Sequence, residues 1–441
     1  MVDLAEGPPV ISAERLGDLE LTPARLKVAA VCMIGVALAT TVLPFCAVGA
    51  ALGPMMLELG WGANQLSLSY ALMLWAAALS VWPVGILIDR YGARPVVALG
   101  AVAIALVSLM LPLVRHFWQF CALFSLLGVC GAVGLGYSKI IATLFGRRLG
   151  LALGVFAAEG SALSMILPLA TNRLVQESGW RGAFAILGVL VLAIAPLLYF
   201  GLATRRGEAE PPRATDPGAE GMNASQAVKT RAFWLIVLAT LVSGVVGNIV
   251  LAGVGAALVH RGLGDAAAGL RGTPIGLLAT LAGPICAGLV LDRTRSPVVA
   301  VAAYLLSALT CVVWAVVSPG FGGKPLLMAG FVLGAFAFSA QSPMVGYLFS
   351  RYFGLKSFAT ACSLQSFIQA MVIGVAGTFI AQSMGALGQE PVVFAIGTAA
   401  PLAAAALYLL LPAYRFGAPP EPGLVGQSPR SFRTWWSRAP S

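Results

Sequence analysis

The 441-residue chain is 59% hydrophobic, only 10% charged, and carries a net charge of +10. An ordinary soluble domain has about 25% charged residues, so this chain has too few polar groups to cover a surface that faces water. The composition therefore argues against a soluble globular protein and indicates a membrane protein, whose apolar surface faces lipid. Lys and Arg cluster in short gaps between apolar runs, without the interleaved aromatics of a nucleic-acid interface, so the expected partner is the lipid bilayer and not nucleic acid.

The first 27 residues are polar and include the acidic Asp3, Glu6 and Glu14. A secretory signal peptide starts with basic residues and reaches its apolar segment at once. We therefore predict that 1–27 is a cytoplasmic tail and that the apolar run behind it stays in place as a spanning helix.

Twelve apolar runs follow, each near the roughly 20 residues that a helix needs to cross a bilayer. The predicted spans are 28–56, 65–88, 95–114, 118–144, 149–175 and 181–203 in the first half, and 232–258, 267–291, 297–318, 326–350, 358–384 and 391–413 in the second. The polar, Pro-rich segment 204–231 reads as a flexible linker. The prediction is an all-α membrane protein of twelve transmembrane helices in two six-helix bundles, 28–203 and 232–413, with a tail at 414–441.

The placement of basic residues predicts the orientation. Twenty of the 27 Lys and Arg residues fall on the side of the termini and the linker, and six fall on the other side. Because cytoplasmic loops carry the excess of Lys and Arg, both termini and the linker are expected in the cytoplasm of a bacterial inner membrane.

The two halves repeat each other. The segment 85–90 reads Gly-Ile-Leu-Ile-Asp-Arg and ends the second span, while 288–293 reads Gly-Leu-Val-Leu-Asp-Arg and ends the eighth. A Phe-Gly pair also follows the fourth span at 145–146 and the tenth span at 353–354. Parallel repeats of this kind are one of the known transporter designs.

The segment 85–94 resembles the signature loop between spans two and three of the major facilitator superfamily. The resemblance implies the fold of that family, and it implies that this loop holds the cytoplasmic ends of the two halves together in the outward-open state. A carboxylate at one helix end can accept hydrogen bonds from the N-terminus of another helix, and glycines permit close packing and a tight turn. The simpler alternative is an ordinary charged turn. The predicted gating residues are Gly85, Asp89, Arg90, Gly92 and Arg94, with the second copy at Gly288, Asp292 and Arg293.

The segments 145–154, 179–184 and 350–354 resemble the bacterial monocarboxylate and oxalate/formate carrier branch of that family. This resemblance implies organic anions as substrates. The chain departs from the animal monocarboxylate carriers, because its first span has no lysine and the Asp/Arg pair of their eighth span falls on Thr280 and Pro284.

Lys139 and Glu159 lie inside predicted spans, where charges are costly and point to function. Lys139 lies eight residues before Arg147, about 12 Å from that helix end, and Glu159 lies eleven after Arg148, about 16 Å in. The two depths nearly match on adjacent antiparallel helices. We therefore predict a pair that binds an anionic substrate and couples it to a proton; the alternative is a structural ion pair.

Arg271 lies about 9 Å into the eighth span and could either bind an anionic substrate or extend to the outer surface. Uncharged polar candidates for the substrate site share positions inside spans, where the alternative is helix–helix contact. They are Thr40, Thr41, Asn248, Gln341, Gln365 and Gln369.

The remaining reactive residue types predict neither a metal site nor a cofactor. His116 and His260 lack metal-ligand neighbours and are expected at the membrane surface. The cysteines are expected to be buried thiols without disulfides; they are Cys32, Cys46, Cys121, Cys130, Cys286, Cys311 and Cys362. The sequence has no phosphate-binding loop, so the chain is not expected to hydrolyse ATP or to be an enzyme.

The sequence thus predicts a monomeric secondary carrier that works by alternating access on a small organic anion, by proton symport or anion exchange. An exporter of amphipathic compounds on the same fold is one alternative. A membrane sensor without transport is another.

Overall fold

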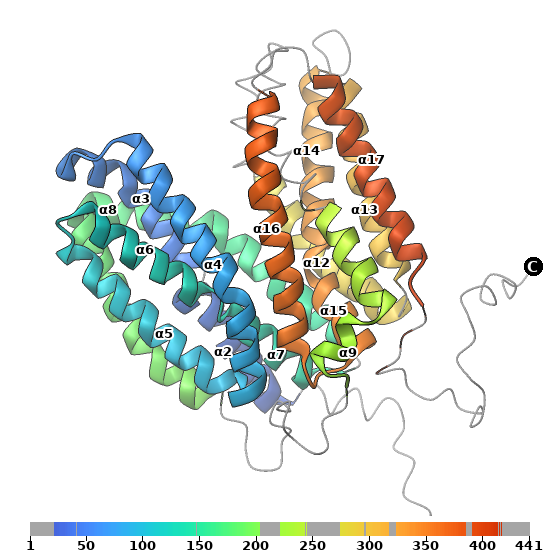
Figure 1. The fold of residues 1–441 in the computed structure, drawn as a ribbon, viewed down its shortest axis with the longest axis horizontal. Coiled ribbons are helices and arrows are strands. Elements are labelled where there is room, and N and C mark those ends of the chain that lie inside the picture. Colours follow the sequence, from blue (N-terminus) through green and yellow to red (C-terminus); the bar gives the residue numbers. More distant parts are fainter. Residues whose placement is uncertain are drawn as a thin grey trace, which may run out of the picture.

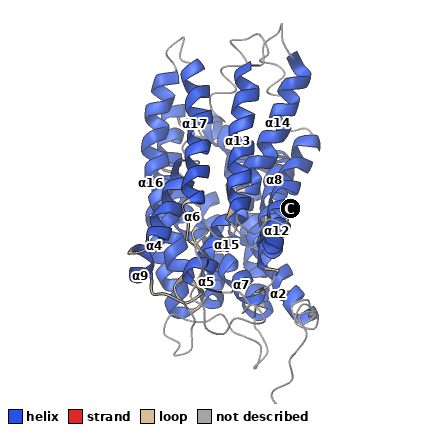
Figure 2. Cartoon of the chain, turned by 90° about the vertical axis from the view of Figure 1, so that its right-hand side faces the viewer, coloured by secondary structure: helices blue, strands red, loops and turns tan. Residues whose placement is uncertain are grey.

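The computed structural model describes residues 22–40, 42–146, 148–202, 221–242, 244, 274–294, 297–316, 323–384, 390–412, 414 and 416. Within these ranges the chain is helical apart from short turns and one isolated bridge between Gly221 and Gly354. Figure 2 shows long helices running in one general direction and no strand among the described segments. The all-α prediction is confirmed.

The first half contains six predicted spans. Its elements are α2 (Pro23–Ile34), a π-helical segment (Gly35–Thr40), α3 (Val42–Leu59), α4 (Ala63–Tyr91), α5 (Ala93–Met110), a 3-10 turn (Leu111–Leu113), α6 (Phe117–Gly131), α7 (Gly134–Leu144) and α8 (Leu149–Gly201). In α8, Gly179 has φ 69° and ψ 167°, a conformation that breaks the helix and separates the fifth span from the sixth.

The second half is described in shorter pieces. Its elements are α9 (Ala224–Val228), a helix over Arg231–Val242, α12 (Pro274–Thr294), α13 (Val298–Val316), α14 (Gly323–Ala340), α15 (Ser342–Phe353), α16 (Phe358–Met384) and α17 (Glu390–Leu409). The short helix α9 lies inside the predicted flexible linker 204–231, so the last part of that segment is ordered. The Gln226 side chain accepts a hydrogen bond from the Asn223 N–H, which secures the start of this helix.

The fourth and tenth spans are each broken into two helices, a feature that the apolar pattern does not reveal. In span four, the break between α6 and α7 lies between Gly131 and Gly134, and glycine is a poor helix former. In span ten, the break falls at Gln341, and Pro343 follows at the start of α15. Proline has no backbone N–H to continue the preceding helix, which favours a new start there.

Helices long and apolar enough to cross a bilayer number six within the described residues, and four shorter apolar helices accompany them. Many large apolar side chains on their outer surfaces are exposed, as expected where lipid replaces water. Examples are Leu57, Leu99, Leu113 and Phe200. The expectation that every cysteine is buried is wrong for Cys286, which is exposed on α12, because one face of that helix points outward.

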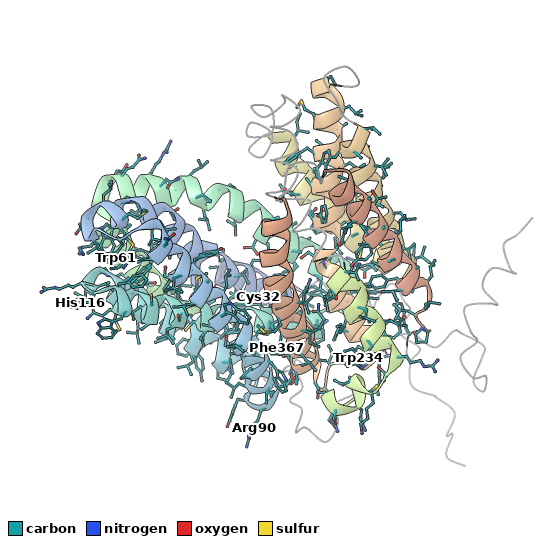
Figure 3. The ribbon with its side chains drawn as sticks, turned by 45° about the horizontal axis from the view of Figure 1, so that its top comes forward. Cys32, Trp61, Arg90, His116, Trp234 and Phe367 are labelled. Atoms are coloured by element: carbon teal, nitrogen blue, oxygen red, sulfur yellow. The ribbon has the colours of Figure 1, made fainter. Side chains whose placement is uncertain are left out.

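The two halves form separate bundles that converge at one end and diverge toward the other (Figure 1). Between the bundles, α4 packs against α16 and α8 packs against α12. We call the converging end, which carries Asp89 and Asp292, the gate end. The opposite end of the first bundle carries Trp61 and His116, and Figure 3 shows both far from Arg90 at the gate end.

Candidate functional site: the contacts that close the gate end

Asp89 joins the two halves. It lies in the last turn of α4, facing the first turn of α16, where backbone N–H groups have no partner inside their own helix. Its carboxylate accepts hydrogen bonds from the N–H of Thr360 at 2.7 Å, from the N–H of Ala359 at 3.3 Å and from the Thr360 hydroxyl at 2.6 Å. The negative charge also opposes the positive end of the helix dipole. The predicted capping of one helix by a carboxylate on another is confirmed.

Two glycines make this contact possible. A Cβ added at Gly85 would lie 2.8 Å from the Ala359 carbonyl oxygen and 2.6 Å from the Ser363 Cβ, so any side chain there would push α4 away from α16. Gly92 connects α4 to α5 with φ 93°, a conformation that residues with a Cβ rarely adopt. The close packing and the tight turn predicted for these positions are confirmed.

Lys139 binds Asp89. Its ammonium lies 2.7 Å from the Asp89 Oδ1 atom, and both side chains are almost completely buried. The predicted pairing of Lys139 with Glu159 is therefore wrong in this structure. Matching depths along two helices do not determine which way each side chain faces, and on α7 Lys139 faces α4.

Asp292 repeats the arrangement in the second half. At the end of α12, its two oxygens accept hydrogen bonds from the N–H groups of Gly150 and Leu151, both at 2.7 Å. These two residues form the first turn of α8. A Cβ on Gly288 would lie 2.7 Å from the Gly150 carbonyl carbon, so this helix pair also depends on glycine. Each half thus caps a helix of the other.

The predicted gating arginines do not join the halves. Arg94 donates a hydrogen bond to the Tyr199 carbonyl at 2.6 Å, and its guanidinium lies 4.3 Å from the centre of the Tyr199 ring. Both residues belong to the first half. Arg90 is exposed and lies over its neighbour Tyr91, and Arg293 is exposed at the end of α12. Among the described contacts, the carboxylates of the repeat cross between halves and these arginines do not.

Arg351 is a cross-half contact that the sequence analysis missed. It lies in the last turn of α15, is buried, and donates a hydrogen bond at 2.7 Å to the carbonyl of Gly146 at the end of span four. Its guanidinium also lies 5.1 Å from the Tyr347 ring centre. The available signal was the Phe-Gly pair that follows both spans: Arg351 precedes one copy and its partner Gly146 belongs to the other.

The polar candidates of the second half bind one another. Gln365 donates to the Thr240 hydroxyl at 3.1 Å and to the Gln369 side chain at 2.9 Å, and Gln369 donates to the Thr240 carbonyl at 3.3 Å. Gln341 donates to the Ser307 hydroxyl at 2.8 Å. The geometry fits helix–helix contact, the alternative that the sequence left open.

Glu159 differs from every candidate above. It lies on α8, half-buried, and its Oε2 atom is buried and accepts no hydrogen bond from the part of the chain that the structure describes. The side chains of the remaining candidates lie outside the described residues; they are Thr40, Thr41, Asn248 and Arg271.

The motif at 179–184 makes contacts within the first bundle and not between the halves. Arg181 forms an ion pair with Glu58 at 3.1 Å, and the Trp180 indole donates a hydrogen bond to the same carboxylate. The Gly179 break positions these two residues beside the end of α3. This contact joins α3 to α8 at the end of the first bundle opposite the gate end.

Two bundles of apolar helices, joined by reciprocal caps at one end, have the architecture of a class of membrane transporters built from two repeated halves. The chain belongs to the major facilitator superfamily, whose family model matches residues 28–377. Its relatives include the "Uncharacterized MFS-type transporter YcxA" of Bacillus subtilis, 32% identical over 143 residues, which are 32% of this chain and 35% of that protein. Mouse "Monocarboxylate transporter 11" is 35% identical over 170 residues, 37% of this chain and 36% of that protein. The match thus spans about a third of each relative.

Solved structures share the fold over most of the chain. The Escherichia coli fucose:proton symporter FucP superposes with a TM-score of 0.66 at 12% identity, covering 88% of this chain and 99% of that chain. The human organic anion transporter MFSD10 superposes with a TM-score of 0.63 at 16% identity, covering 88% and 98%. At such identities the likeness shows the fold alone.

Proposed function

We propose that the chain is a proton-coupled secondary transporter of small organic molecules, and that Glu159 is its proton-binding group. The observation that carries the proposal is the Glu159 carboxylate, which lies inside a span with one oxygen buried and without a hydrogen-bond partner among the described residues. An isolated charge at the centre of a spanning helix costs at least ~2.5–3.5 kcal/mol on insertion scales. Binding a proton, or a cation from the transport pathway, removes that cost.

The charge of the substrate then decides the direction of coupling. An anion placed near Glu159 is repelled while the carboxylate is ionised, so the anion and the proton bind together and move together, which is symport. A cation competes with the proton for the same carboxylate, which gives exchange. A ligand shifts such an equilibrium only through its different affinities for the two protonation states.

An organic anion moved by proton symport is the first candidate. The name of one similar protein, a monocarboxylate transporter, supports it. Anion exchange is the variant in which a second anion replaces the proton.

Export of amphipathic compounds is the second candidate, and one observation favours it. Lys139, which was predicted to bind a substrate carboxylate, instead forms an ion pair with Asp89 and so does not offer a free cation to an anionic substrate. Similar proteins with export names are the Salmonella choleraesuis "Multidrug resistance protein MdtG" and the "Fujikurins efflux protein" of Gibberella fujikuroi. Each aligns with only about a quarter of this chain.

The gate end is assigned to the cytoplasm, as the excess of Lys and Arg on that side predicts. With that assignment, the structure corresponds to the outward-facing state of the transport cycle. A reporter enzyme fused after Ser441 should be active in the cytoplasm, and periplasmic activity would contradict the assignment.

Proteoliposomes that contain purified wild type, Glu159→Gln or Glu58→Gln test the role of Glu159. Labelled monocarboxylates, dicarboxylates and lipophilic cations serve as substrates, with and without an imposed pH gradient. Glu159→Gln should abolish accumulation driven by the gradient but keep the exchange of internal for external substrate. Glu58→Gln is the matched control, because Glu58 is already paired with Arg181. If Glu159→Gln accumulated substrate as well as wild type, the proton site would lie elsewhere.

A further inference from the structure

A short segment after α17 (Glu390–Leu409) contacts the gate end. Leu411, Pro412, Tyr414 and Phe416, which we call the strap, follow α17 and lie against α15. Leu411 is buried, and Tyr414 and Phe416 are half-buried. The segment is therefore held against α15 by buried and half-buried side chains.

The strap makes four specific contacts with α15. The Tyr352 hydroxyl donates a hydrogen bond to the Pro412 carbonyl at 2.7 Å, and the Phe416 N–H donates to the Arg351 carbonyl at 2.9 Å. The Tyr414 ring packs edge-on against Tyr352 with centroids 5.1 Å apart, and against Tyr347 at 6.4 Å. The contacts thus combine backbone hydrogen bonds with aromatic packing.

Two α15 residues that the strap contacts, Tyr347 and Arg351, also bind other elements of the gate end. Arg351 binds the Gly146 carbonyl of the first half. The Tyr347 hydroxyl donates a hydrogen bond at 3.2 Å to the carbonyl of Leu291, the neighbour of Asp292. The Tyr347 ring also lies under the Arg351 guanidinium. One tyrosine therefore connects the strap, the cross-half arginine and the end of α12.

We propose that the strap keeps the gate end closed by positioning Arg351 on Gly146, so that the C-terminal segment regulates how often the carrier opens toward the gate end. The proposal rests on the alternating-access function but not on Glu159 or on the substrate. Opening the gate end moves Gly146 away from Arg351, and Arg351 makes its bond only while the strap and Tyr347 hold its side chain in place. Arg351 is a positioning residue that acts on the conformational equilibrium.

Cys362 provides a built-in reporter of gate opening. It lies on α16, three residues after Ala359, and is buried while the gate is closed. Cys311 on α13 is also buried but lies outside the gate contacts, so it reports general loosening of the fold. Alkylation of both thiols by N-ethylmaleimide in membrane vesicles can be measured separately by peptide mass spectrometry.

Three variants test the strap: Tyr414→Ala, Tyr414→Phe and a chain that ends at Pro412. Tyr414→Ala and the shortened chain should raise the alkylation rate of Cys362 roughly 2- to 10-fold, the size expected for losing one hydrogen bond or aromatic contact, and leave Cys311 unchanged. Tyr414→Phe should behave like wild type, because it keeps the ring and the Tyr414 hydroxyl has no hydrogen-bond partner in the described structure. Arg351→Ala should match or exceed Tyr414→Ala, and Arg351→Lys should lie between it and wild type.

Two results would overturn the proposal. One is a wild-type alkylation rate of Cys362 in both Tyr414→Ala and the shortened chain. The other is an equal rise at Cys362 and Cys311, which would mean that the strap stabilises the whole bundle and does not act on the gate. Since the measurement uses no substrate and no pH gradient, its outcome is independent of the Glu159 experiment.

Discussion

In each half, an aspartate at a helix end caps a helix of the other half, but the two aspartates differ in burial. Asp89 is 3% exposed, accepts three hydrogen bonds from the start of α16 and pairs with the fully buried Lys139. Asp292 is half-buried and accepts two backbone hydrogen bonds from the start of α8. The repeat in the sequence therefore specifies a shared capping geometry, while the two carboxylates differ in how deeply they are buried.

The difference follows from burial. The three hydrogen bonds that Asp89 accepts from α16 are almost fully buried, and a hydrogen bond to a charged group contributes about 1.5–3 kcal/mol. Removing a partly exposed helix cap typically costs about 0.5–2 kcal/mol, because water can replace it. We therefore expect the gate to depend more on Asp89 than on Asp292.

Asp89→Asn should have the largest effect. The substitution removes the ion pair, leaves the Lys139 ammonium buried without a counter-charge and weakens the cap of α16. Cys362 should be alkylated roughly 10- to 100-fold faster, since a hydrogen bond to a charged group contributes about 1.5–3 kcal/mol and the contacts of Asp89 that cross between the halves are hydrogen bonds. Transport should fall more than substrate binding does, because Asp89 acts on the population of states. Transport at the wild-type rate would refute the gating role.

Lys139→Met should have a smaller effect of the same sign. The Asp89 carboxylate then loses its ammonium partner but keeps the N–H groups of Ala359 and Thr360. Substrate binding, measured by equilibrium dialysis on purified protein, should survive. The double variant Asp89→Asn, Lys139→Met should be less perturbed than the sum of the single effects, as expected for two residues in direct contact. Loss of binding in Lys139→Met alone would instead support the substrate role first inferred from the sequence.

Asp292→Asn should have the smallest effect of the three. An amide oxygen can still accept one of the hydrogen bonds from Gly150 and Leu151, and water can reach the site. We expect transport to fall roughly 2- to 30-fold, in line with the loss of a helix cap. A loss of transport as large as that of Asp89→Asn would show that burial does not determine how much each cap contributes to closing the gate end.

Sequence reasoning predicted the fold and both caps, but it missed other parts of the site. Apolar runs mark spans because a bilayer demands them, and the spacing of Gly85 and Asp89 by one helical turn places both on the same face of α4. The partner of Lys139 was wrong because the rotation of α7 about its own axis depends on tertiary packing. Arg351 was missed because a basic residue near a helix end is also what the topology rule expects.

The bridge between Gly221 and Gly354 has a practical consequence for protein engineering. The N–H of Met222 donates a hydrogen bond to the carbonyl of Phe353 at 2.8 Å. The next residue, Gly354, lies six residues before Thr360, whose N–H binds Asp89. The connector between the halves is thus anchored beside the helix start that Asp89 holds. A fluorescent domain inserted just after Gly221 would pull on that turn and disturb the motion it was meant to record. Labels intended as silent tags belong upstream of this anchor point.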